Sequence, residues 1–234
     1  LLLWTAIWAI ASTFLNYVVG LGLALLTNKK GIKLKGMWRT IYILPYAMPA
    51  FISLLVFRLM FNGIGPINNM LVNFGIERIP FFTDPILAKI SVLAINTWVG
   101  APYFMVLLSG SLTNISSTLY EAAEIDGATK MQQFKHITLP MLLFQTAPVL
   151  ILSFAYNFNN FGAIYLLTDG NPVNSNLKFA GETDILVTWL YKLTVNQQQF
   201  GMAAVISIVL FAFIATVSLY NFRKSKSFTE EDMI

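Results

Sequence analysis

Two sets of polar, uncharged residues recur at helical spacing inside otherwise apolar stretches. Each set occupies positions i, i+4 and i+7, and residues spaced this way at about 100° per residue return to one face of a helix. An amide without a partner in hydrocarbon costs several kcal/mol, so neither strip is expected to face lipid. The two sets are Asn96, Gly100 and Tyr103, and Ser153, Asn157 and Asn160.

These strips suit recognition of a neutral polyhydroxyl ligand. An asparagine amide carries both a hydrogen-bond donor and an acceptor, and four aromatic residues accompany the strips, namely Trp98, Tyr103, Phe154 and Tyr156. The alternative is that the amides join neighbouring helices, at about 0.6 to 2 kcal/mol per contact. Two strips at mid-depth favour one shared aqueous cavity. The surrounding stretches contain no ionisable Asp, Glu, Lys, Arg or His, which disfavours an ion pathway.

The segments that carry the strips have the composition of membrane spans. Hydrophobic residues make up 56% of the 234 positions and charged residues 11%, with mean hydropathy +0.67, whereas soluble domains carry about 25% charged residues. Crossing a bilayer takes roughly 20 apolar residues, and the runs show none of the alternation of a membrane β-barrel. We therefore predict an all-α polytopic transmembrane helical bundle, one domain over 1–234, with one or more N-terminal spans missing. The five charge-free runs are 1–28, 40–57, 90–120, 137–168 and 193–222.

Basic residues predict the orientation of these five spans. They cluster after the first, third and fifth runs, and cytoplasmic loops are enriched in Lys and Arg. The C-terminus is therefore expected in the cytoplasm, with external loops at 62–86 and 168–195. Tryptophans near the predicted boundaries suggest an interfacial belt, and prolines inside the runs predict kinks or broken turns. The basic clusters are Lys29, Lys30, Lys33, Lys35 and Arg39; Lys130 and Lys135; and Arg223, Lys224 and Lys226. The tryptophans are Trp4, Trp8, Trp38 and Trp189, and the prolines are Pro45, Pro49, Pro102 and Pro148.

The predicted cytoplasmic segment 114–139 forms a helical elbow. A short helix around residues 119–126 is expected to stop at Gly127, since a tight reversal needs a positive φ. A second short helix, 129–136, would then continue toward Pro140. Such an elbow either docks a partner or lies on the membrane surface.

The elbow resembles a specific signature. Glu-Ala-Ala at 121–123, Gly127 four residues beyond the second Ala, and Ile-Thr-Leu-Pro at 137–140 are similar to the EAA motif of bacterial ABC-importer permeases. The resemblance implies that the elbow is a coupling helix seated in a cytoplasmic ATPase subunit. The docking residues that it implies are Glu121, Ala122, Ala123 and Gly127.

Further segments resemble the MalF-type permeases of maltose/maltodextrin importers, and the resemblance covers essentially the whole chain. The matching segments are 43–47 with 51–53, 96–100 with 102–103, 153–161 and 166–170. Val99 and Tyr156 stand where that type has Leu and Phe, and Ala101 replaces a Tyr, which leaves room for a different or longer sugar. The sugar-binding residues that the resemblance implies are Asn96, Val99, Gly100, Tyr103, Ser153, Tyr156, Asn157 and Asn160.

The same resemblance implies the partners. A second homologous permease, two cytoplasmic ATPase subunits and an extracellular or periplasmic sugar-binding protein would import an oligosaccharide across the bacterial cytoplasmic membrane, with lipid around the spans. The sequence lacks a phosphate-binding Walker loop, so ATP and magnesium are expected on the ATPase, with no cofactor in this chain and no nucleic-acid partner. With no cysteine and only His136, no metal site or catalytic cluster is expected. The alternatives are an ABC permease for raffinose or mixed oligosaccharides, an ion-coupled secondary transporter, and a membrane enzyme.

Overall fold

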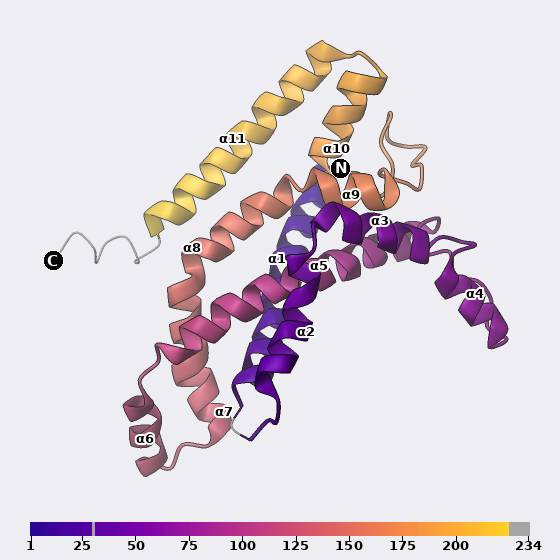
Figure 1. Ribbon diagram of the computed structural model, residues 1–234. Coiled ribbons are helices and arrows are strands. Elements are labelled where there is room, and N and C mark those ends of the chain that lie inside the picture. Colours follow the sequence, from indigo (N-terminus) through magenta and orange to yellow (C-terminus); the bar gives the residue numbers. More distant parts are fainter. Residues whose placement is uncertain (30, 225–234) are drawn as a thin grey trace.

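The computed structural model describes residues 1–29 and 31–224, and this part is built from helices (Figure 1). Within it, β pairing is limited to one isolated bridge between Val173 and Gly181, so the all-α prediction is confirmed. Two π-helical turns occupy Phe134–Thr138 and Lys192–Asn196. The helices are α1 (Leu2–Asn28), α2 (Lys35–Ala47), α3 (Ala50–Met60), α4 (Pro66–Asn73), α5 (Pro85–Thr113), α6 (Ser117–Ile125), α7 (Lys130–Gln133), α8 (Leu139–Phe158), α9 (Phe161–Thr168), α10 (Leu186–Tyr191) and α11 (Phe200–Lys224).

Three helices are long and apolar enough to cross a membrane. They are α1, α5 and the continuous helix 130–158, which joins α7, the first π turn and α8. The α2–α3 pair reaches that length only together and is bent by 88°. Helix α11 begins with the apolar segment Phe200–Thr216 and continues to Lys224. The number of five spans therefore stays a prediction.

Helices α1 and α5 form a close parallel pair, because each presents a glycine to the other. A Cβ added to Gly20 would lie 2.5 Å from the Cβ of Phe104, and one added to Gly100 would lie 2.5 Å from Nδ2 of Asn16. A side chain at Gly20 would push the helices apart, because backbone atoms of Ala101 and Met105 also lie within 3.0 Å, whereas one at Gly100 would displace the side chain of Asn16. The pair forms the centre of the molecule, and α8 packs against it in the opposite direction, with Tyr17 Oη 3.3 Å from Thr146 Oγ1.

Trp8 lies in this centre and not in an interfacial belt, so that prediction was wrong for Trp8. The side chain is fully buried. Its indole N–H donates to the backbone oxygen of Asn157 at 2.9 Å, which ties α1 to α8.

Two predicted spans end earlier than their charge-free runs. The helix in 137–168 stops at Phe158, because Asn160 caps a new helix by accepting a hydrogen bond from the Ala163 N–H at 3.2 Å. The helix in 90–120 stops at Thr113, and α6 begins after the cap residue Ser116. The predicted break at a proline is confirmed at Pro49, between α2 and α3, while Pro102 and Pro148 are accommodated inside α5 and α8.

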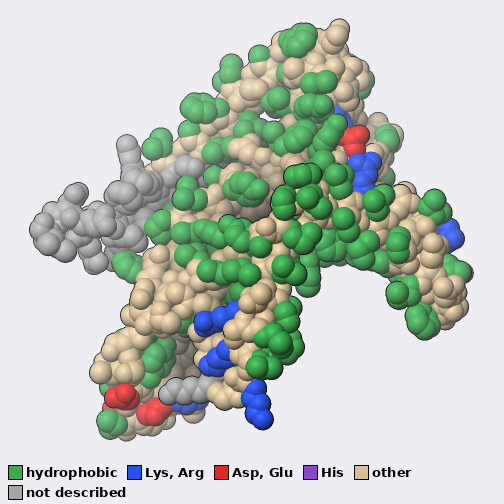
Figure 2. Space-filling model, viewed as in Figure 1, with side chains coloured by type: hydrophobic (Ala, Val, Ile, Leu, Met, Phe, Trp, Pro, Cys, Tyr) green, Lys and Arg blue, Asp and Glu red, His purple; other side chains and the backbone are tan. Residues whose placement is uncertain are grey.

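The predicted cytoplasmic loops share one end of the molecule. The connection between α1 and α2 lies at the same end as α6 and α7, while the N-terminus, α9 and α10 lie at the opposite end (Figure 1). Charged side chains gather at the first end and apolar ones cover the middle (Figure 2). Lys30, Lys226 and Ile234, as well as the side chains of Arg223 and Lys224, lie outside the described residues. The orientation in the membrane, including the cytoplasmic C-terminus, stays a prediction.

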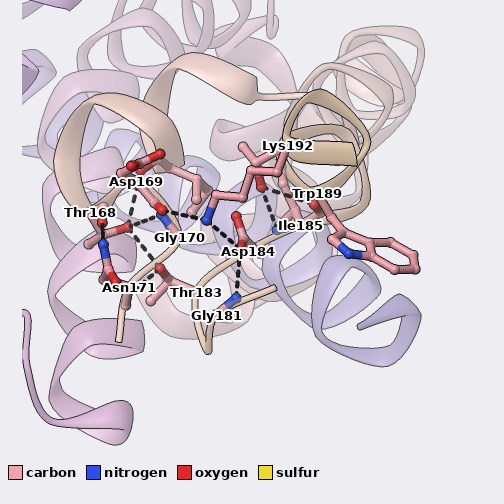
Figure 3. Close-up of polar contacts among 12 residues, drawn as sticks. Thr168, Asp169, Gly170, Asn171, Gly181, Thr183, Asp184, Ile185, Trp189 and Lys192 are labelled. Carbon is pink, nitrogen blue, oxygen red and sulfur yellow. Dashed lines mark hydrogen bonds and ion pairs between the residues drawn. The ribbon is translucent and has the colours of Figure 1, made fainter. Parts of the chain in front are cut away.

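The predicted external loop 168–195 is folded around a buried ion pair (Figure 3). Asp184 is fully buried, and its Oδ2 lies 2.8 Å from Nζ of Lys192 and accepts the Gly181 N–H at 2.7 Å. Lys192 also donates to the backbone oxygen of Asp169 at 2.6 Å. A Cβ on Gly170, where φ is +77°, would lie 2.0 Å from Asp184 Oδ1, so only glycine fits there. We call residues 169–192 the clamped loop.

Polar contacts fix the clamped loop to α1 and α5, and one of them is the Leu186 N–H, which donates to Thr5 Oγ1 at 3.0 Å. The indole N–H of Trp4 in α1 donates to the backbone oxygen of Thr183 at 3.2 Å. Lys89 in the first turns of α5 pairs with Glu182 at 2.5 Å. The loop therefore closes one end of the α1–α5 pair.

Candidate functional site

A cavity of about 770 Å³ lies between α1, the α2–α3 break, α5 and α8. All eight residues predicted to bind sugar line it, so the two predicted strips face the same space, although Asn160 lies beyond the end of α8 as the cap residue of α9. Val99, Gly100 and Tyr103 come from α5, while Ser153 and Tyr156 come from α8. The lining residues from the prediction are Asn96, Val99, Gly100, Tyr103, Ser153, Tyr156, Asn157 and Asn160.

Three asparagines connect the two strips. Asn96 donates through Nδ2 to Oδ1 of Asn157 at 3.3 Å, and its own Oδ1 accepts from Nδ2 of Asn160 at 3.2 Å. The side chains are nearly buried, with exposures of 8%, 3% and 8% for Asn96, Asn157 and Asn160. The amides therefore join α5 to α8, as one interpretation predicts, and they also line one cavity, as the other predicts.

The three asparagines differ in what they offer a ligand. Asn157 uses both amide hydrogens, on Thr13 Oγ1 at 3.3 Å and on the Ser153 backbone oxygen at 2.9 Å. Asn96 and Asn160 each use one of their two amide hydrogens within the described residues. One N–H on each of these two therefore has no partner among the described residues, while Asn157 holds the cluster in place.

The aromatic residues that line the cavity are fewer than the sequence predicts. Tyr103 and Tyr156 line the cavity and expose 37% and 68% of their surfaces. Trp98 instead lines a second, largely apolar cavity of about 510 Å³ between α1, α2, α3 and α5. Phe154 packs on Phe158, with ring centroids 5.9 Å apart. The prediction that all four aromatic residues accompany the strips was therefore wrong for Trp98 and Phe154.

Sequence reasoning missed the contribution of α1. Asn16 lines the cavity, is 6% exposed, and packs on Gly100; its Oδ1 is buried without a hydrogen-bond partner among the described residues. A pattern in the sequence could have revealed it, because Ser12, Asn16 and Gly20 repeat at i, i+4 and i+8 in the first apolar run. Gly100 thus serves the site by letting Asn16 approach.

The α2–α3 break is the second contribution that was missed. Residues 46–50 all line the cavity, together with Leu54 in α3. Pro45 and Pro49 indicated a break in this segment, but the sequence did not indicate which helices would lie opposite it.

The elbow is folded onto the start of the long helix 130–158. Tyr120 Oη lies 2.8 Å from Thr138 Oγ1, and Gly127 reverses the chain with φ +80°, which confirms the positive φ that was expected there. Thr129 and Gln132 then form a reciprocal cap at the start of α7. Glu121, Ala122 and Gly127 are exposed and Ala123 is partly buried, so a docking partner can reach this surface.

His136 and the acidic residues form no metal site in the part of the chain that is described, where no group of three possible ligands comes together. The His136 Nδ1 atom lies 3.0 Å from the backbone oxygen of Gln132, one helical turn earlier. His136 is therefore an exposed polar residue that contacts the backbone of its own helix.

Comparison with protein families gives one match. Residues 16–226 match the family described as "Binding-protein-dependent transport system inner membrane component". This range includes the candidate cavity residues, the elbow and the clamped loop.

Curated relatives are sugar permeases by name. The galactooligosaccharides transport system permease protein GanP of Bacillus subtilis is 41% identical over 232 residues, covering 98% of this chain and 55% of GanP. The maltodextrin transport system permease protein MdxF of the same organism is 42% identical over 240 residues, covering 99% and 55%. The maltose/maltodextrin permease MalF of Vibrio cholerae is 42% identical over 230 residues, covering 96% and 44%. The chain spans about half the length of the curated relatives it matches.

Solved structures share the fold. A chain of a bacterial ABC transporter for import of the acidic polysaccharide alginate matches with TM-score 0.80 and 24% identity, over 96% of this chain and 77% of that one. A chain of the MetNI methionine ABC transporter matches with TM-score 0.64 and 18% identity, over 96% and 92%.

Proposed function

Because the chain belongs to the family of binding-protein-dependent transport system inner membrane components, we propose that it is the transmembrane permease subunit of an ATP-driven importer for maltodextrin-type oligosaccharides. In this role the chain itself is not catalytic. It forms part of the route that the sugar follows, and separate cytoplasmic ATPase subunits hydrolyse ATP.

One observation carries the proposal: the two polar strips face a single cavity. Its volume of about 770 Å³ lies within the range of about 300 to 1,000 Å³ that is common for small-molecule sites. Spare N–H groups on Asn96 and Asn160 and the exposed rings of Tyr103 and Tyr156 supply hydrogen bonds and apolar faces. A sugar ring presents both hydroxyl groups and an apolar face, so it matches this combination.

The lining also indicates the charge of the ligand. None of the described residues that line the cavity is an Asp, Glu, Lys or Arg. A neutral glycan therefore fits better than an acidic one such as alginate, and an ion-coupled carrier would need an ionisable group at this depth. Relatives named for galactooligosaccharides and for maltodextrins are about equally similar. Import of galactooligosaccharides is accordingly the second candidate, and raffinose or mixed oligosaccharides remain within the same class.

The remaining parts of the chain have proposed partners. The elbow 114–139 would dock an ATPase subunit through Glu121, Ala122, Ala123 and Gly127, and a second homologous permease would complete the pore. The segments 62–86 and 168–195 would face the external binding protein that delivers the sugar. In this arrangement the C-terminus would lie in the cytoplasm. Closure of the ATPases would then move the elbow and reorient the helices around the cavity.

Uptake by the complete transporter tests the proposal. The full-length protein, its partner permease, the ATPases and the binding protein are reconstituted in proteoliposomes, and ATP-dependent uptake of labelled maltodextrins, galactooligosaccharides and alginate fragments is compared. We expect maltodextrin uptake to exceed that of the acidic fragments at least about tenfold. Preference for the galactooligosaccharide would select the second candidate, and failure to import any neutral glycan would overturn the proposal.

A further inference from the structure

The α2–α3 break forms one wall of the cavity. Helix α2 ends at Ala47, α3 begins at Ala50, and the two axes differ by 88°. Pro49 has no N–H to donate to the helix, so this break is imposed by the sequence itself. Tyr46 is the large polar side chain on this wall.

The ring of Tyr46 is positioned beside a residue already assigned to the site. Its centroid lies 5.8 Å from that of Tyr103, with 39° between the ring planes. The side chain is 53% exposed and lines the same cavity as the asparagines. The packing on Tyr103 therefore leaves much of the Tyr46 ring open.

We propose that Tyr46 is a further specificity-determining residue, which contacts the transported glycan and forms with Tyr103 an aromatic wall for sugar rings beyond those held at the asparagines. This inference rests on the proposed function. It adds a ligand contact from the α2–α3 break to the strips of α5 and α8.

The geometry of α5 makes this contact depend on glycan length. Tyr103 follows Asn96 by seven residues, which is about 10 Å of helix rise. A short glycan held by the free N–H groups of Asn96 and Asn160 engages the aromatic wall less than a longer chain does. Loss of the Tyr46 ring is therefore expected to penalise long glycans more than short ones.

Tyr42 provides a matched control on the same helix. It stands one turn before Tyr46 and stacks on Trp38, with centroids 5.9 Å apart. It lines the second, apolar cavity and not the candidate site. Replacing it removes the same ring from α2 without touching the proposed wall.

The test compares uptake of a five-ring and a two-ring α-linked glucan by the complete transporter carrying Tyr46→Leu, Tyr46→Phe or Tyr42→Leu. The ratio of the two uptakes does not depend on how much folded transporter is present. We expect Tyr46→Leu to lower this ratio about three- to tenfold, the range of an aromatic contact, while Tyr46→Phe and Tyr42→Leu keep the wild-type ratio. Tyr46→Met replaces Tyr46→Leu if the latter does not reach the membrane.

Two results would overturn the inference: an unchanged ratio when the Tyr46 ring is removed, or an equal fall in Tyr42→Leu. A wild-type transporter that imports neither glucan is a different result. It contradicts the proposed function, and this inference with it, before any variant is compared.

Discussion

The three asparagines of the candidate site, Asn96, Asn157 and Asn160, have different hydrogen-bonding roles. Asn157 is held by Thr13 and by its own helix, and it anchors Asn96, which in turn anchors Asn160. The two outer asparagines keep a free amide hydrogen each within the described residues. Removal of Asn157 should therefore disturb the position of the others, while removal of Asn160 should remove one ligand contact and the cap of α9.

Gly100 should tolerate no side chain. In Gly100→Ala, the new Cβ would lie 2.5 Å from Nδ2 of Asn16, so α1 and α5 must separate or Asn16 must leave the cavity. We expect sugar uptake to fall at least about tenfold, with a stability loss of about 1 to 3 kcal/mol from overpacking. Uptake and thermal unfolding in detergent measure the two effects.

Gly110→Ala is the matched control for this change. Gly110 lies on the same helix, and an added Cβ there meets no atom within 4 Å. Wild-type uptake by Gly100→Ala, or an equal loss in both variants, would contradict the role of close packing.

Lys192 should be important for stability through its buried partner. Lys192→Met leaves the fully buried Asp184 without its cation, and breaking a buried pair costs about 3 to 5 kcal/mol. We expect a lower unfolding temperature of the purified protein. Lys130→Met, which breaks a mostly exposed pair with Glu124, should have a much smaller effect; equal effects would contradict the account of the clamped loop.

Residue types and spacing predicted the polar strips because a helix returns to the same face at i+4 and i+7. This reason fails for Asn160, which lies beyond the end of α8 and lines the cavity as the cap residue of α9. They did not predict the environment of Trp8, since an amphipathic ring suits a membrane interface as well as a buried hydrogen bond to Asn157. Tyr46 was missed for a similar reason. The direction of its ring depends on the 88° bend, which no local pattern specifies.

At the scale of elements, the elbow depends on the reversal at Gly127. A φ of +80° is strained for side chains branched at Cβ, whereas asparagine tolerates it better. Gly127→Val should therefore uncouple sugar uptake from ATP hydrolysis, and Gly127→Asn should be milder. The measurement is ATPase co-purification together with sugar-stimulated ATP hydrolysis.

If Gly127→Val bound the ATPase and responded to sugar like the wild-type protein, then the reversal would have no part in coupling. Insertion in the membrane is checked in parallel, because a variant that fails to insert would lose ATPase binding for another reason.

Element boundaries were predicted less well than the elements themselves. Charge-free runs mark apolar segments, but a helix that breaks inside such a run leaves no change in charge. The break after Phe158 arises because Asn160 caps α9, and adjacent asparagines at 159 and 160 were the available indication. The break at Pro49 was predictable because proline removes a backbone donor.

At the scale of the whole molecule, the glycine contacts make α1 and α5 one unit. Gly20 and Gly100 bring the two helices together, and the clamped loop holds both at one end through Trp4 and Lys89. Helix α8 joins this unit through the asparagine cluster at the cavity, and it continues into the elbow at its other end. In the proposed function, a movement of the elbow would therefore reach one wall of the cavity through the continuous helix 130–158.

The central claim is that the two strips face one aqueous space through which sugar passes. The 234-residue sequence contains no cysteine, so a thiol introduced at one of its positions is measured against the unsubstituted transporter, which gives the background labelling. Ser153→Cys places a thiol in the cavity, and Val209→Cys places one on the exposed apolar surface of α11. In the assembled transporter, a membrane-impermeant thiol reagent reports which of the two is reached by water.

The account predicts that Cys substituted at position 153 reacts at least about tenfold faster than Cys substituted at 209, since only an ionised thiol in water reacts readily, and that transported sugar slows the reaction at 153 alone. Equal, slow labelling at both positions, or labelling at 153 that sugar does not affect, would contradict it.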